Sequence, residues 1–211
     1  MISHGKRDTL TGIPFIIIPE DSGQLSWTHE FTIGRGEAVK MNNESVNTKK
    51  LALTAIFAAV AVVGSMFSFP VFGSKCAPVQ HLVNVLCAVF LGPGWGLAAA
   101  FIASVIRNIT GLGTLLAFPG SMCGALLSGL LYKKFKTLPA AWIGEVFGTA
   151  VIGGMLAYPI ASLIMGNTSA TLFIFVVPFL ISTVGGTIIA AVITMALQSR
   201  GVIGLLREQI E

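Results

Sequence analysis

Charged side chains are scarce in this 211-residue sequence, since Asp, Glu, Lys and Arg together make up only 10% of it. Soluble domains carry about 25% charged residues. Hydrophobic residues account for 54% of the chain, and the mean hydropathy is +0.84. The shortage of charge excludes an ordinary soluble domain and indicates a polytopic membrane protein in contact with the lipid bilayer.

Motifs for metals, redox chemistry and nucleotides are also lacking. The three cysteines form no C-x-x-C pair, and the three histidines are far apart in the sequence. The chain therefore has neither a disulfide framework nor a Cys/His cluster of the kind that holds zinc. It contains no G-x-x-x-x-G-K-[ST] loop, which excludes ATP binding in the P-loop manner. We expect no metal site and no cofactor.

Residues 1–40 differ from the rest of the chain because they are rich in charge and hold one short apolar patch, at 13–19. That patch is too short and too closely bounded by proline to cross a bilayer, and no signal-peptide cleavage site follows it. We expect residues 1–40 to be a disordered tail or a misassigned start, with Met41 as the true start. Residues 41–211 then form one substrate-binding membrane domain.

Apolar runs divide residues 41–211 into six helices. We predict them at 51–69, 79–91, 97–108, from a break at 111–120 to about 132, and at 140–165 and 172–198. Small residues at 120, 124 and 128 share one helix face, which predicts tight helix packing. The predicted fold class is all-α, a polytopic membrane bundle of six transmembrane helices.

Lysines and arginines are distributed unequally between the two sides of this bundle. With the N-terminus inside, the inner flanks hold Lys49, Lys50, Lys133, Lys134, Lys136, Arg200 and Arg207, and the outer flanks hold at most Lys75 and Arg107. By the positive-inside rule, this distribution predicts a multi-pass protein of the plasma membrane with both termini cytoplasmic. The basic residues then face anionic lipid rather than nucleic acid.

The stretch 107–121 places polar and helix-breaking residues between two apolar runs. Arg107 and Asn108 come first, two glycines follow, and a Pro-Gly pair ends at Gly120. An arginine at the centre of a lone membrane helix costs about 2.5–3.5 kcal/mol, and irregular backbone at membrane depth is tolerated where it is buried in protein or lines a cavity. Ionisable residues in such a position indicate a functional site.

Polar residues from several predicted helix ends fall on the outer side of the membrane in this topology. His81 and Asn84 lie three residues apart on the second helix, hence on one face. We predict an outward-facing cavity for a small molecule, lined by His81, Asn84, Arg107, Asn108, Thr114 and Tyr158.

Each of these residues also has a purely structural interpretation. The alternatives are an interhelical hydrogen bond for His81 and Asn84, extension to the outer headgroups for Arg107, helix caps for Asn108 and Thr114, and an interface position for Tyr158. Glu145 lies below the predicted cavity, towards the cytoplasmic side, and we expect it to pair with a buried donor.

The membrane region offers little for catalysis or proton coupling. Ser121 follows a glycine, as serine nucleophiles often do, but His81 is the one histidine of this region and nothing in the sequence brings the two together. Glu145 is the one carboxylate within the predicted helices, and no internal repeat of the kind expected for alternating access is evident. We therefore expect no enzyme activity, and an autonomous secondary transporter is a less favoured alternative.

Several motifs carry a family resemblance. The six-helix layout, the Lys49-Lys50 start, the Ala55/Ala59 pair and the Leu91-Gly92-Pro93 turn resemble the substrate-binding S components of energy-coupling-factor (ECF) vitamin transporters. More narrowly, the chain resembles the ThiW family over residues 41–200. The motifs of that resemblance are His81-x-x-Asn84-Val85-Leu86, the run from Arg107-Asn108 to Gly124, Gly144-Glu145 and Ala157-Tyr158-Pro159.

The resemblance implies an S component that captures hydroxyethylthiazole for thiamine salvage. It implies a transmembrane subunit and a pair of ATPases as partners, because the chain has no nucleotide site of its own. Docking is expected on the face of Ala55 and Ala59, since small residues at that spacing let another helix approach closely.

The implied ligand sets requirements for the cavity. Phe118 and Tyr158 are the candidates for apolar walls around a thiazole ring, and Asn84, Asn108 and His81 are those for its hydrogen bonds. Arg107 either bonds the ligand's hydroxyl group, is structural, or serves an anionic ligand. The alternative is therefore an S component for another vitamin or precursor, either thiamine or a phosphorylated thiazole.

Overall fold

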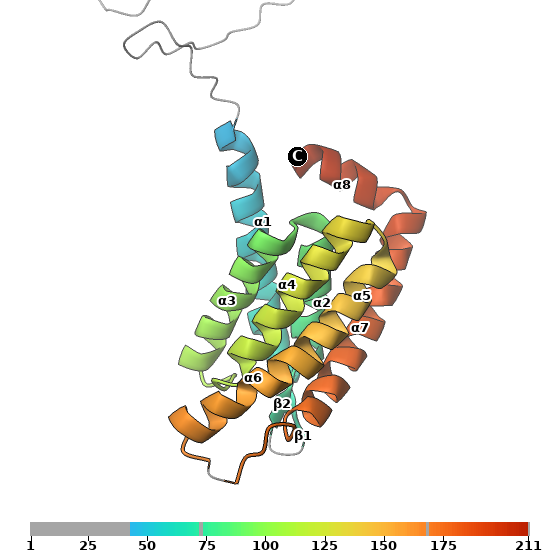
Figure 1. Ribbon diagram of the computed structural model, residues 1–211. Coiled ribbons are helices and arrows are strands. Elements are labelled where there is room, and N and C mark those ends of the chain that lie inside the picture. The colour runs from blue at the N-terminus through green and yellow to red at the C-terminus, as the bar shows by residue number, and fades with distance from the viewer. Residues whose placement is uncertain (1–42, 72–73, 168, 211) are drawn as a thin grey trace, which may run out of the picture. The chain divides into compact units, whose positions relative to one another are not determined.

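The computed structural model of the chain describes residues 43–71, 74–167 and 169–210. The predictions for residues 1–40 and for a start at Met41 concern residues outside this set. The described residues are mostly helices packed side by side, with one two-stranded hairpin (Figure 1). The predicted all-α bundle of membrane type is confirmed.

Seven helices are present among the described residues, whereas the sequence predicted six. The six bundle helices are α1 (Asn43–Gly64), α2 (Pro78–Phe90), α3 (Pro93–Ile109), α4 (Ala117–Phe135), the continuous segment Leu138–Ile164 with α5 (Leu138–Phe147) and α6 (Gly154–Pro159), and α7 (Val176–Ser199). The seventh, α8 (Val202–Ile210), follows the last predicted helix and was not predicted. It is too short to cross a bilayer, but Ile203 packs on the buried cluster that contains Tyr132 and Leu138, and this tertiary contact supports the helix.

Within the described ranges, three helices are long and apolar enough to cross a membrane, namely Thr48–Phe67, Leu138–Ile164 and Val176–Ser199. The helix α2 is apolar but has only 13 residues, in agreement with the short helix predicted there. Both α2 and α3 begin with a proline in the first turn. Proline lacks an N–H group, but at this position an N–H group would have no hydrogen-bond partner within the helix.

Glycines set the distance between α4 and the segment Leu138–Ile164. A methyl group on Gly153 would come within 2.6 Å of the Cα atom of Gly120, so the two backbones are in direct contact. The small residues of α4, at 120, 124 and 128, are four residues apart. Those of the other helix, at 144, 148 and 153, are four and then five residues apart, and the longer step spans the π-helical turn η2 (Gly148–Gly153). The wider π turn keeps the small residues opposite one another, and the predicted tight packing is confirmed. The facing pairs are Gly153 with Gly120, Gly148 with Gly124, and Gly144 with Ser128.

A short hairpin and a glycine-containing connection close one end of the bundle. The strands β1 (Phe69–Val71) and β2 (Ser74–Cys76) pair antiparallel, in the connection between the first two predicted helices. The Lys75 ammonium group donates a hydrogen bond of 3.1 Å to the Gly111 carbonyl and so ties the hairpin to the α3–α4 connection. Gly111 has a φ of 73°, which favours glycine.

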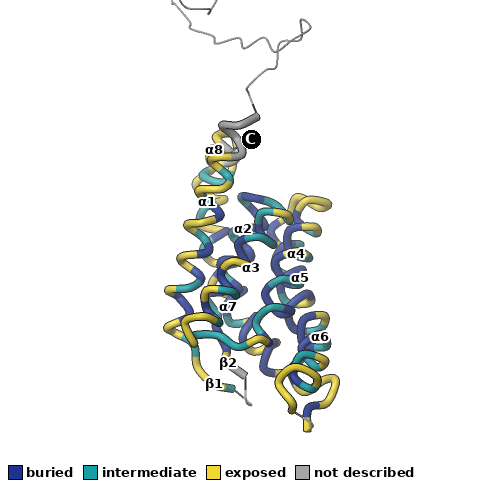
Figure 2. The backbone as a smooth tube through the Cα atoms, turned by 90° about the vertical axis from the view of Figure 1, so that its left-hand side faces the viewer, coloured by how far each residue is buried: buried dark blue, intermediate teal, exposed yellow. Residues whose placement is uncertain are grey.

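The opposite end of the bundle carries both described ends of the chain and the turn between α4 and α5 (Figure 1). The Lys49 ammonium group donates a hydrogen bond of 3.0 Å to the Gln209 carbonyl, so α1 and α8 meet there. Buried residues lie along the faces at which the helices meet (Figure 2). Ala55 and Ala59 are exposed on α1.

Candidate functional site

A cavity of about 40 Å³ lies at the hairpin end of the bundle. This is room for about three waters at roughly 10–15 Å³ each. Residues from the hairpin, α2, α3, α4, η2 and α7 all contribute to its wall. The lining residues are Lys75, Ala77, Gln80, His81, Arg107, Ala117, Gly120, Ser121, Thr149, Phe179 and Ser182.

A chain of hydrogen bonds joins Glu145, His81 and Ser182. His81 Nδ1 lies 2.8 Å from Glu145 Oε1, and His81 Nε2 lies 3.0 Å from Ser182 Oγ. Ser182 Oγ also accepts a 3.0 Å bond from the Ala77 N–H group. A neutral His81 with its proton on Nδ1 satisfies all of these groups, because the Ser182 hydroxyl can then donate to Nε2.

Glu145 is the acceptor at which this network converges, and its exposed fraction is 0%. Besides the bond from His81, Oε1 accepts bonds from Asn84 Nδ2 at 3.0 Å and from Thr149 Oγ1 at 3.1 Å. The second oxygen, Oε2, is buried without a hydrogen-bond partner. A methyl group on Gly124 would lie 2.8 Å from both carboxyl oxygens, so the missing side chain of Gly124 makes room for the carboxyl group.

Arg107 lines the cavity and is only 3% exposed. Its NH1 group donates a 3.0 Å bond to Gln80 Oε1, and Gln80 Nε2 donates in turn to Asn84 Oδ1 at 3.4 Å. The Nε–H group of Arg107 is buried with no partner. Arg107 is therefore held inside the bundle and does not extend to the headgroups.

Two serines connect the network to α3 and α4. Ser104 Oγ and Ser121 Oγ are 2.8 Å apart, and Ser121 Oγ donates to the Ala117 carbonyl at 2.8 Å. Ser104 therefore donates to Ser121, because a hydroxyl group has a single hydrogen to give. Asn84 Nδ2 also reaches the Ser121 carbonyl, at 3.1 Å, so α2, α3 and α4 are joined below the cavity.

The positions of these side chains follow from helix spacing and from one further glycine. Gln80 and Asn84 are four residues apart on α2, so they lie on one face, and His81 is beside them on the side of α7. A methyl group on Gly186 of α7 would come within 2.7 Å of the His81 Cβ atom. The absence of a side chain at Gly186 brings α7, and with it Ser182, close enough to bond the imidazole.

Three of the residues predicted to bind ligand belong to this site. His81 and Arg107 line the cavity, and Asn84 lies in the network behind its wall. Asn108 instead donates bonds to the Ser104 carbonyl at 2.8 Å and the Thr114 carbonyl at 3.1 Å. It thereby fastens the α3–α4 connection, which holds Arg107 in place.

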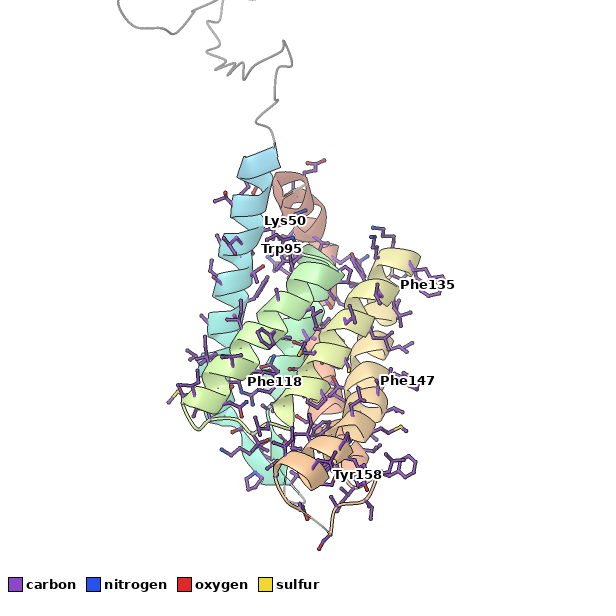
Figure 3. All side chains as sticks on the ribbon, turned by 60° about the vertical axis from the view of Figure 1, so that its left-hand side comes forward. Lys50, Trp95, Phe118, Phe135, Phe147 and Tyr158 are labelled. Atoms are coloured by element: carbon purple, nitrogen blue, oxygen red, sulfur yellow. The ribbon has the colours of Figure 1, made fainter. Side chains whose placement is uncertain are left out.

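The two predicted aromatic walls lie elsewhere. The Phe118 ring packs on the Phe101 ring, with 5.9 Å between centroids. Tyr158 lies towards the hairpin end of the bundle (Figure 3), where it packs on the buried cluster that contains Leu116 and Phe175. The ligand-binding roles of Asn108, Thr114, Phe118 and Tyr158 stay predictions, since none of these four is in the cavity lining.

Sequence reasoning missed several residues of the site. Gln80, Thr149, Phe179 and Ser182 line the cavity. The expectation that Glu145 pairs with a buried donor is confirmed, and that donor, His81, is itself a residue of the site. Gln80 carried a usable signal, because it is polar and stands on the same face of an apolar helix as Asn84. Thr149 and Ser182 carried none, since hydroxyl groups within apolar helices commonly bond their own backbone.

The arrangement is suited to holding a small polar molecule in a fixed orientation. Buried side chains that are locked by hydrogen bonds surround the cavity, and Phe179 and Ala117 add apolar surface. Small-molecule sites combine mostly apolar walls with a few fixed polar groups in this way.

Comparison with known proteins gives this cavity a family context. A family model described as thiamine-precursor transporter protein (ThiW) matches residues 51–200. That range includes every residue of the cavity lining and the whole hydrogen-bond network. No curated protein matches the chain. The family match covers well over half of the sequence, and the chain belongs to the ThiW family of thiamine-precursor transporter proteins.

Proposed function

We propose that this chain is the substrate-binding S subunit of an ECF-type transporter, and that it captures hydroxyethylthiazole for thiamine salvage. The observation that carries the proposal is a cavity at one end of a membrane-type bundle, lined by fixed polar side chains, in a chain of the thiamine-precursor transporter family. The chain has no P-loop motif, so ATP must act through partner subunits. We propose a binding role rather than an enzymatic one.

The proposed ligand makes specific demands on the cavity. Hydroxyethylthiazole has about nine non-hydrogen atoms, so even the ceiling of about 1.5 kcal/mol per atom limits its binding free energy to about 13 kcal/mol. Tight binding therefore requires most of its atoms to be in contact. Nine atoms also need more room than about three waters occupy, so ligand entry involves displacement of side chains such as Phe179.

Coupling to partners is proposed at the outer face of α1. Ala55 and Ala59 are both exposed there, and their spacing lets a partner helix approach closely. We place both termini on the cytoplasmic side of the cell membrane. The first half of α1 carries Lys49 and Lys50, and the last turn of α4 carries Lys133 and Lys134. The start of α1 and the end of α4 lie at the same end of the bundle (Figure 1), as the positive-inside rule requires.

Isothermal titration calorimetry on the purified full-length chain tests the ligand. We expect saturable heat with hydroxyethylthiazole and a weaker response, or none, with thiamine. Absence of heat with hydroxyethylthiazole, its phosphate ester and thiamine would remove the proposed binding function. Uptake of labelled hydroxyethylthiazole in cells with and without the ATPase subunits tests the coupling, because uptake without ATPases would indicate an autonomous secondary transporter.

A second candidate function is hydrolysis, which one observation favours. The connectivity Glu145–His81–Ser182 is that of a carboxylate–histidine–serine triad, with bonds of 2.8 and 3.0 Å. The Ser182 oxygen is already engaged by the Ala77 N–H group, which makes it a weaker nucleophile. A fluorophosphonate probe decides between the two functions: labelling of Ser182 in the native protein would support hydrolysis, and an unlabelled protein would support binding alone.

A further inference from the structure

The buried polar group that the described cavity wall leaves without a partner is a donor. Among the described side chains that line it, the buried nitrogen or oxygen atom without a partner is Arg107 Nε. Two acceptors of the wall already receive one bond each. Gln80 Oε1 accepts from Arg107 and Ser182 Oγ accepts from Ala77.

The protonation state of His81 does not change this result. If His81 is neutral, the Ser182 hydroxyl donates to Nε2. If His81 is protonated, Nε2–H donates to Ser182, whose own hydrogen becomes free for the ligand. In both states the Ser182 oxygen keeps its bond from Ala77. Protonation of His81 therefore adds a hydroxyl donor to the cavity and leaves no acceptor without a bond.

The charge of the lining has a single sign. Arg107 and Lys75 are the charged residues among the cavity residues. Glu145 stands outside the lining, bonded to His81, and no described carboxylate lies within ion-pair distance of Arg107. A buried cation without a carboxylate partner is costly. A ligand that accepts hydrogen bonds from Arg107 is therefore favoured, and a cationic ligand is repelled.

We infer that the cavity selects a ligand that accepts hydrogen bonds and carries no positive charge, and that Arg107 is the specificity-determining residue. This inference rests on the proposed function and names its substrate class. A neutral thiazole alcohol meets the requirement through its ring nitrogen or hydroxyl oxygen, and its phosphate ester meets it through phosphate oxygens. Thiamine fails because its thiazolium ring is cationic. An aminopyrimidine also has acceptors in its ring nitrogens, but its amino group adds two donors. It is disfavoured because no buried acceptor of the described lining lacks a partner for them.

Calorimetry with four ligands on the full-length chain tests the inference. The ligands are hydroxyethylthiazole, its phosphate ester, thiamine and 4-amino-5-hydroxymethyl-2-methylpyrimidine. We expect at least one thiazole to bind about 100-fold more tightly than thiamine, because like charges at a binding site cost several kcal/mol. Tighter binding of the ester would mean that Arg107 serves an anion, and tighter binding of the alcohol that it serves a neutral acceptor. Both results support the inference.

Variants separate the selectivity from a merely structural role. Arg107→Met should weaken the binding of the more tightly bound thiazole by about 10- to 100-fold, which corresponds to the loss of a hydrogen bond from a charged group. The ratio of thiazole affinity to thiamine affinity should then fall below about 10-fold. Arg107→Lys keeps the charge and should keep thiamine excluded. Arg200→Met is the matched control, because Arg200 is exposed and follows α7 at the opposite end of the bundle from the cavity.

The outcomes that overturn the inference differ from those that overturn the proposed function. Thiamine or the aminopyrimidine binding within about threefold of the better thiazole to the wild-type chain overturns the inference alone. A parallel loss of affinity for every ligand in Arg107→Met, with an unchanged ratio between them, does the same because it is the signature of a structural residue. No binding of any of the four ligands overturns the proposed thiamine-precursor function itself.

Discussion

Removal of the Glu145 carboxyl group is the most informative perturbation of the buried network. Glu145→Ala deletes an acceptor that receives three hydrogen bonds. Asn84 retains its second bond, to the Ser121 carbonyl, but His81 Nδ1 and Thr149 Oγ1 lose the partner that the structure gives them. The variant thus leaves two buried donors unsatisfied inside a fully enclosed space.

The expected loss of stability follows from that count. An unsatisfied buried donor costs about 1–3 kcal/mol, so two of them cost about 2–6 kcal/mol. We therefore expect Glu145→Ala to lower the free energy of unfolding by about 2–6 kcal/mol.

Glu145→Gln should be less damaging, because its amide oxygen can replace Oε1 as the acceptor. The amide nitrogen then occupies the place of Oε2, which has no partner in the native structure. Its hydrogens stay unsatisfied at a cost of about 1–3 kcal/mol. The expected order of stability is wild type, then Glu145→Gln, then Glu145→Ala.

Reversible unfolding of the purified chain in mixed detergent micelles measures these differences. A double-mutant cycle with His81→Ala should give a coupling of about 1.5–3 kcal/mol, because Glu145→Ala costs less once the imidazole is gone. The matched control is Glu208→Ala, a change at an exposed position of α8 that should stay within about 0.5 kcal/mol of wild type. Equal destabilisation by Gln and Ala, or strictly additive effects with His81→Ala, would refute the network as described.

Three further predictions concern the packing, the docking face and the hairpin. Gly124→Ala should destabilise the protein by about 1–3 kcal/mol by overpacking, because its methyl group would lie 2.8 Å from the Glu145 carboxyl oxygens. Gly185→Ala, where a methyl group meets nothing within 4 Å, should instead stabilise the protein by up to about 1 kcal/mol. Thermal unfolding compares the two variants, and equal effects on stability would show that Gly124 is not needed for close packing against Glu145. Ala55→Trp should retain hydroxyethylthiazole binding by calorimetry but abolish uptake, and normal uptake would argue against docking on this face. Burial in the hairpin raises the pKa of the Cys76 thiol. In a variant whose other cysteines are alanine, maleimide should therefore label Cys76 slowly at pH 7 and faster as the pH rises. Labelling at the rate of a free cysteine would show that the hairpin does not protect the thiol.

Helix positions could be predicted well because burial in a membrane leaves a strong signal in the sequence. The predicted 79–91 and 97–108 correspond to α2 (Pro78–Phe90) and α3 (Pro93–Ile109). The predicted helix at 140–165 corresponds to Leu138–Ile164. Prolines and glycines at the boundaries supplied the end points. The seventh helix, α8, was missed because a short amphipathic segment is held by packing rather than by its composition.

The site was predicted in part, for reasons that are also physical. His81, Asn84 and Arg107 could be selected because polar and ionisable side chains are costly in an apolar chain. Tyr158 was grouped with them because it falls at the outer end of a predicted helix, and Phe118 as an aromatic wall for a thiazole ring. In the structure their rings pack on other apolar side chains. A position at one end of the bundle does not specify which side of a helix faces a cavity.

By itself, the sequence determined that this protein is a bundle of apolar helices with a costly polar stretch at Arg107 and no nucleotide-binding motif of its own. Only the tertiary structure decided that Glu145, His81 and Ser182 form one hydrogen-bonded chain across three helices. The physical reason is that this arrangement depends on glycines whose partners lie far away in the sequence. Gly186 lets α7 approach His81, and Gly124 of α4 makes room for the Glu145 carboxyl group. The sequence can show that a buried charged side chain needs a partner, but only the packing of the helices determines which side chain that partner is.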